Sequence, residues 1–142
     1  MRTTLPEMLW PLMESPTHKA DHCFICGRTA PLEQHHIVRR GAGELIKDGR
    51  KLRKPTITLC GFGNNLRDAD GRFYCHGLAH HGMLHFRVAE VERSNRAGKP
   101  KKRYRGGDTF ALTDKVKKLQ FLVTSEPTKY QDALQMEGWQ NV

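Results

Sequence analysis

The chain has 142 residues, and 24 Lys and Arg against 15 Asp and Glu give it a formal net charge of +9. This length fits one domain, and the basic excess predicts attraction to a polyanion, most commonly a nucleic acid, with a merely soluble basic protein as the alternative. No segment is apolar enough to span a membrane, and prolines and acidic residues interrupt residues 1–16, which argues against a signal peptide. We therefore expect a cytoplasmic protein, in which four cysteines are more often metal ligands than disulfides.

Residues 1–20 are predicted to form an N-terminal extension in front of a core domain at residues 21–92. Apolar residues of this extension have the spacing of one helix face, but Pro11 limits any helix to about one turn. Only 37% of the chain is hydrophobic, so a bound metal ion is expected to contribute to stability.

The four cysteines of the core form the first metal-binding pattern. Cys23 and Cys26 bracket two residues in "CFIC", a spacing that lets two thiolates reach one tetrahedral ion. Cys60 and Cys75 are separated by 14 residues that are rich in Gly, Asn and Asp, so their ends can converge. We predict one structural zinc ion bound by all four. Four buried free cysteines are the alternative, and no βαβ pattern supports a redox pair.

Histidines form the second pattern, in "LEQHHIVRR" and "CHGLAHHGMLH". His35 and His36 are adjacent, and such a doublet is useful for binding a metal or accepting a proton near neutral pH. His76 and His80 are four residues apart and would share one face of a helix, as in other helical metal sites. His81 and His85 have the same spacing, but Gly82 is expected to end the helix, so we favour the first pair.

The segment after residue 83 is predicted to begin with a strand over Leu84–Val91, where apolar residues partly alternate. Residues 93–108 are basic and glycine-rich, which predicts a flexible loop. Its cations are expected to follow a DNA backbone without reading its sequence, and a solvated loop is the alternative. The expected DNA-binding residues are Lys99, Lys101, Lys102, Arg103 and Arg105.

Residues 109–142 are predicted to form a strand and helices that pack on the core. Thr109–Thr113 is expected to be the returning strand of a hairpin. Asp114–Val123 is expected to be a helix with Thr113 as its N-cap, because Val116 and Leu119 would share one face. A short helix is expected after Pro127.

Read in order, these motifs resemble the HNH endonucleases, the ββα-metal nucleases, and most of all their small phage-encoded type. The resemblance covers residues 20–85. It rests on the four segments Cys23–Cys26, His35–Ile37, Leu59–Gly63 and Cys75–His80, which read C-x-x-C, H-H-I, L-C-G-x-G and C-H-G-x-x-H. It implies an α+β fold with a small ββα-metal core and a zinc knuckle, to which the C-terminal hairpin and helices would be an extension.

The resemblance also implies roles for individual residues. His35, His76 and His80 would bind the catalytic divalent ion, and His36 would be the general base that activates water. Glu33 matches a carboxylate that some members place near the metal. The family's middle Asn is absent from its usual place before Leu59, and Asn64 or Asn65 is the candidate to take over its role of ordering the loop and orienting the base. The four cysteines would bind a separate structural zinc.

The expected function is that of a metal-dependent DNA endonuclease or nickase with low sequence specificity. Imidazole ligands suit Zn, Ni, Co and Mn, and Mg less well, and the pattern does not choose among these ions. Arg39 and Arg40 are candidates for phosphate contacts, with a solvated turn as the equal alternative. A phage or prophage origin and a role beside a terminase would fit the resemblance. The alternatives are a zinc-stabilised DNA-binding module without catalysis, or a zinc adaptor that binds another protein.

Overall fold

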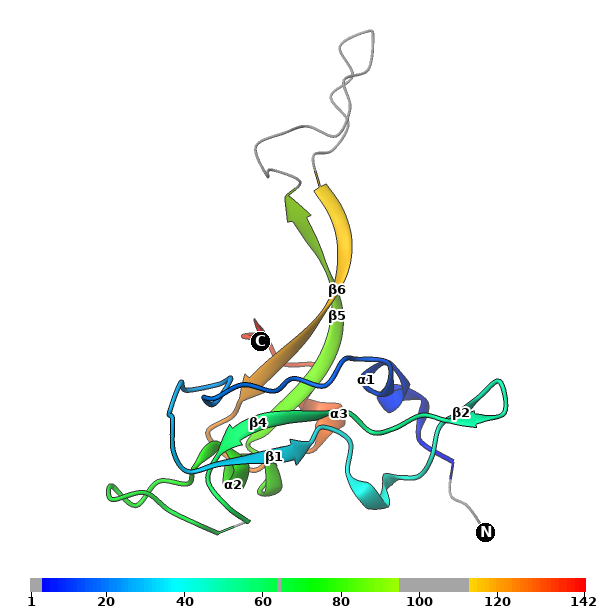
Figure 1. Ribbon diagram of the computed structural model, residues 1–142. Coiled ribbons are helices and arrows are strands. Elements are labelled where there is room, and N and C mark those ends of the chain that lie inside the picture. Colours follow the sequence, from blue (N-terminus) through cyan, green and yellow to red (C-terminus); the bar gives the residue numbers. More distant parts are fainter. Residues whose placement is uncertain (1–3, 64, 95–112) are drawn as a thin grey trace, which may run out of the picture. The chain divides into compact units, whose positions relative to one another are not determined.

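The computed structural model describes residues 4–63, 65–94 and 113–142. It divides into two compact units, Met1–Val88 with Leu119–Val142, and Ala89–Lys118 (Figure 1). The architecture is mixed α+β, with small antiparallel sheets and few helices. Within the described residues, no helix combines the length and the apolar character that a membrane crossing requires.

Two antiparallel strands and a short helix lie at the centre of the first unit. Strand β1 (Leu32–His36) pairs with β4 (Thr56–Cys60), so that His35 lies opposite Ile57. The segment at His18 bonds to the other edge of β4, where His18 N donates to Thr56 O at 2.8 Å. Covered in this way, residues 57–60 of β4 are all buried. Helix α2 (Cys75–His80) follows along the chain and ends at His81.

Short elements fill the connections of this unit. The N-terminal helices η1 (Glu7–Leu9) and α1 (Trp10–Met13) precede β1, and η2 (Arg40–Ala42) follows it. Strands β2 (Ile46–Lys47) and β3 (Arg50–Lys51) form a hairpin. Its two turn residues, Asp48 and Gly49, have φ of 54° and 76°, as the tightest hairpin turns require, and Asp-Gly is a favoured pair there.

The C-terminal part of the chain forms a three-stranded sheet in the order β5-β6-β7. Strand β5 (Leu84–Ser94) and strand β6 (Thr113–Val123) each contribute residues to both units, and β7 (Gln140–Asn141) pairs with β6 at Gln120 and Phe121. Along the chain, helix α3 (Tyr130–Ala133) connects β6 to β7. The predicted strand at Leu84–Val91 and the short helix after Pro127 are confirmed.

The prediction of a helix over Asp114–Val123 is wrong, because these residues belong to β6. Val116 and Leu119 do have helical spacing, but Val116, Phe121 and Val123 are residue types that favour strands. Pairing with β5 overrides a weak local preference for helix. Of the returning strand expected at Thr109–Thr113, only Thr113 lies within the described residues, and it begins β6.

The core of the first unit combines residues from the N-terminus, β4 and β5. Leu5 and Leu12 are 1% exposed, so the predicted N-terminal extension contributes to the core. Ile57 and Leu59 from β4 are fully buried, and Phe86 from β5 packs in the same cluster. This packing fixes β1, α2 and the start of β5 around one cleft.

Candidate functional site

Four cysteines from three parts of the first unit converge on one point. Cys23 and Cys26 flank a tight turn in which Gly27 N donates to Cys23 O at 2.9 Å with φ of 81° at the glycine. Cys60 ends β4 and Cys75 begins α2. Their four sulfur atoms lie within 4.8 Å of one another, so the sequence-predicted ligands are brought together.

The cysteine cluster has the chemistry of a structural zinc site. A tetrahedral ion with Zn–S bonds of about 2.3 Å separates its sulfurs by roughly 3.8 Å, and Cys26 Sγ lies 3.5 Å from Cys60 Sγ. Backbone N–H groups point at two sulfurs, from Ile25 to Cys23 Sγ at 3.4 Å and from Cys75 to Cys60 Sγ at 3.3 Å. Hydrogen bonds from Cys60 and Cys75 lower the pKa of the Cys23 thiol. These donors can hold one Zn²⁺.

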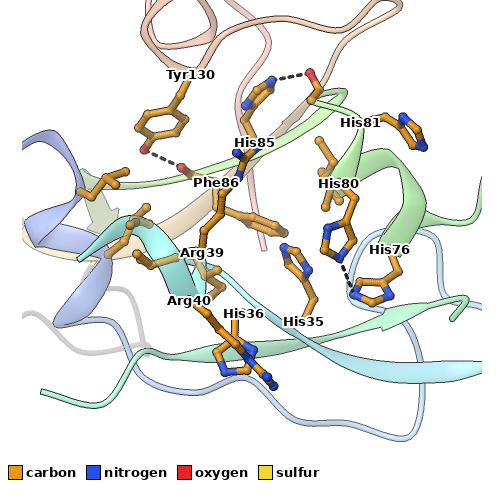
Figure 2. Close-up of a pocket in the computed structure, with 18 of the residues that line it drawn as sticks. His35, His36, Arg39, Arg40, His76, His80, His81, His85, Phe86 and Tyr130 are labelled. Atoms are coloured by element: carbon orange, nitrogen blue, oxygen red, sulfur yellow. Dashed lines mark hydrogen bonds between the residues drawn. The ribbon is translucent and has the colours of Figure 1, made fainter. Parts of the chain in front are cut away.

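Three histidines form a second cluster (Figure 2). His35 projects from β1, and His76 and His80 share one face of α2, with their Nε2 atoms 3.1 Å apart. The His35 ring centroid lies 5.0 Å from that of His76 and 5.1 Å from that of His80. One ring nitrogen from each lies within 4.8 Å of the other two.

The histidine cluster also fits a divalent metal ion. Burial, with His76 and His80 nearby, lowers the pKa of His35 to about 3, and burial lowers the pKa values of His76 and His80 as well. All three imidazoles are therefore neutral near pH 7 and have a lone pair to donate. The 3.1 Å separation of two ring nitrogens is close to the roughly 3.3 Å between nitrogens on one tetrahedral ion. Three ligands leave coordination positions open for a substrate.

Two features next to the cluster add to this fit. The buried Nδ1 of His76 has no hydrogen-bond partner among the described residues, which is unusual for a buried polar atom. Glu33 Oε2 lies 3.7 Å from His76 Nδ1. The same oxygen accepts a hydrogen bond from Gly63 N at 3.4 Å. Glu33 is therefore beside the cluster, where the resemblance places a carboxylate.

The histidine cluster opens into a cleft of about 1290 Å³ that His36, Arg39 and Arg40 also line. His36 lies beside Arg40 and away from the three clustered rings (Figure 2), because neighbouring residues of a strand point to opposite sides. Partial burial, and then the charges of Arg40 and Lys54, lower the pKa of His36 below its usual 6.5. Its imidazole is therefore neutral at physiological pH.

Arg39 lines the cleft and acts electrostatically on its histidines. Its charge contributes to lowering the pKa values of His80 and His85, so its guanidinium lies within electrostatic reach of both. The turn that presents it is fixed by Lys54, whose Nζ donates to Arg39 O at 2.6 Å and to Arg40 O at 2.7 Å. The Lys54 contacts thus fix the backbone from which both arginines extend, and both side chains line the cleft.

Contacts of His81 join the end of α2 to the loop between Cys60 and Cys75. The loop residues involved are Asn65, Arg67 and Phe73. His81 Nε2 donates to Asn65 Oδ1 at 2.9 Å and stacks on Phe73 at 4.5 Å between centroids. The Arg67 guanidinium lies 4.0 Å above Phe73. Asn65, predicted to order the loop or orient the base, therefore contacts His81 and not His36, and Asn64 lies outside the described residues.

Sequence reasoning missed several residues of this site. His85, Lys129 and Tyr130 line the cleft, and Lys54 fixes the turn after His36. His85 carried a signal in its i,i+4 spacing from His81, but nothing local marks the other three. The predicted DNA contacts Lys99, Lys101, Lys102, Arg103 and Arg105 lie outside the described residues. Comparison with protein families, with curated proteins and with solved structures finds no match to this chain.

Proposed function

We propose that the chain is a metal-dependent DNA endonuclease or nickase of the HNH type. One observation carries the proposal: three neutral imidazoles arranged to hold one ion share a cleft with a fourth histidine and two arginines. The order of two antiparallel strands and a helix, β1, β4 and α2, supports it, as does the separate cysteine cluster. The net charge of +9 favours a polyanionic substrate.

Each residue of the cleft has its own role in the proposed phosphodiester hydrolysis. His36 accepts a proton from the attacking water as the water oxygen bonds to phosphorus. The bond from phosphorus to the 3′ oxygen breaks, which leaves a 5′-phosphate and a 3′-hydroxyl that takes its proton from solvent. Arg39 pairs with non-bridging phosphate oxygens and holds the backbone in place. A divalent ion on His35, His76 and His80 supplies Lewis acidity toward the phosphate and its leaving oxygen when bound.

A supercoiled-plasmid assay tests this proposal. We expect nicking that depends on added Mg²⁺, Mn²⁺, Ni²⁺ or Zn²⁺, stops in EDTA, and falls by at least about a hundredfold in His36→Ala. The matched control is His22→Ala, because His22 is exposed and does not line the cleft. Zinc content is measured on every sample, so that a loss of activity with zinc retained reports on the base and not on unfolding.

The second candidate is a zinc-stabilised DNA-binding module without catalysis. It is favoured by the contact of Asn65 with His81, which leaves His36 without an Asn partner among the described residues. Salt-sensitive DNA binding without cleavage by any of the four ions would support this module and contradict the nuclease. Cleavage of equal rate in wild type and His36→Ala would instead identify a contaminant or a different base.

A further inference from the structure

The cleft has a second wall, formed by the segment that follows β6. Pro127, Thr128, Lys129 and Tyr130 line it together with the histidine cluster. Figure 2 shows Tyr130 and His85 on one side of the cleft, with His36 and Arg40 on the other. A part of the chain far from the histidine motifs in sequence therefore reaches the same cavity.

Hydrogen bonds on both sides fix the backbone of this wall. Thr128 N donates to Gly82 O at 2.9 Å, and Tyr130 OH donates to Phe86 O at 2.6 Å. The approach at Gly82 is close, since a Cβ there would lie 3.3 Å from Thr128 O. Ala133 is fully buried, and its N–H donates to Lys129 O at 2.9 Å. Lys129 therefore occupies a defined position at the cleft.

The Lys129 side chain is exposed, and its charge has no ion-pair partner in the part of the chain that the structure describes. Among the described residues, no carboxylate pairs with Lys129, Arg39 or Arg40, and Glu33 is the only acidic residue that lines the cleft. Three unpaired cations facing one carboxylate give the cleft a positive potential. A cleft of this kind concentrates an anionic ligand.

We propose that Lys129 binds a second phosphate of the DNA backbone, next to the one that is cut. The inference rests on the proposed nuclease function, in which the histidine cluster and Arg39 hold the reacting phosphate. Lys129 directly precedes Tyr130 in the chain and lines the same cleft, and Figure 2 shows Tyr130 across the cleft from His36 and Arg40. A cation next to Tyr130 can therefore meet a neighbouring phosphate of a polymer. It is a binding residue that adds affinity for a polyanion and makes no contact with the reacting atoms.

The test compares a polymer with a single phosphodiester. For Lys129→Gln, kcat/KM is measured on duplex DNA and on bis(4-nitrophenyl) phosphate, which has no second phosphate. We expect the ratio of DNA to diester activity to fall about fivefold in Lys129→Gln and to recover in Lys129→Arg. Lys19→Gln is the matched control, because Lys19 is exposed and does not line the cleft. An unchanged ratio, or equal losses on both substrates, overturns the inference while the nuclease stands.

Binding measurements separate this inference from the proposed function. If the wild-type chain cuts neither substrate, the proposed nuclease function is contradicted. Fluorescence anisotropy with duplex DNA then tests, independently of cleavage, whether Lys129 contacts a phosphate. Loss of one phosphate contact lowers the magnitude of the negative slope of log K against log salt by about 0.9. A slope that is the same in wild type and Lys129→Gln overturns the phosphate contact, whereas a decrease of this size in Lys129→Gln and not in Lys19→Gln supports it.

Discussion

At the scale of single residues, the three clustered histidines differ in how far they take part in packing. His35 and His76 are largely enclosed, whereas His80 is exposed and contributes only its ring to the cluster. His80→Ala should therefore remove one proposed metal ligand without opening the core. We expect more than about a hundredfold loss of metal-dependent cleavage and weaker Ni²⁺ binding by isothermal titration calorimetry. Full activity in this variant would show that the cluster holds no catalytic ion.

The residues that could be predicted are those whose partners lie close in sequence. Cys23 with Cys26, and His76 with His80, follow from spacing alone, because a turn and a helix place each pair on one side. The prediction that His35 joins His76 and His80 as a metal ligand depended on a family resemblance. Lys54 and Lys129 could not be predicted, because their roles depend on which carbonyls and which cavity the folded chain brings to them.

At the scale of elements, α2 could be predicted from residues close in sequence, whereas β6 could not. The i,i+4 histidines and Gly82 predicted a helix that ends near residue 81, and α2 does so. In β6 the spacing of Val116 and Leu119 was misleading, because the pairing of that strand with β5 and β7 is not visible in a local window. Long-range pairing decided the structure there.

Helix α3 and β5 are joined by a hydrogen bond whose strength should depend on pH. Burial raises the pKa of Tyr130 to about 12, from an ordinary value of 10. The fold favours the neutral phenol, which donates to Phe86 O, so this stabilisation is complete below pH 10 and is lost as the pH rises toward 12. Tyr130→Phe should lower the free energy of unfolding by about 1 kcal/mol at pH 8.

Urea unfolding of wild type and Tyr130→Phe at pH 8 and pH 11 measures this dependence. The difference between the two proteins should shrink at pH 11, because the phenol ionises in the unfolded chain above its ordinary pKa of 10 and stays largely neutral in the folded protein. A difference of the same size at both pH values would mean that the hydroxyl contributes no pH-dependent stability.

At the scale of the whole molecule, the first unit keeps two clusters of candidate metal ligands apart. Four sulfur donors suit zinc in a closed structural site, and three imidazoles suit a divalent ion with open positions. The sulfur site joins the turn at Cys23, the end of β4 and the start of α2. It therefore fixes the helix from which His76 and His80 project, so loss of zinc should affect both stability and the second site.

Two single substitutions should separate these roles. Cys75→Ser removes a proposed zinc ligand that is buried at the start of α2. We expect the midpoint of thermal unfolding to fall by more than about 10 °C, since zinc binding is coupled to folding. His80→Ala should shift the midpoint by less than about 3 °C, because its side chain is exposed. Circular dichroism gives the midpoints, and metal analysis gives the zinc content of each protein. If Cys75→Ser loses its zinc and keeps the wild-type midpoint, the four cysteines do not stabilise the fold through a metal ion.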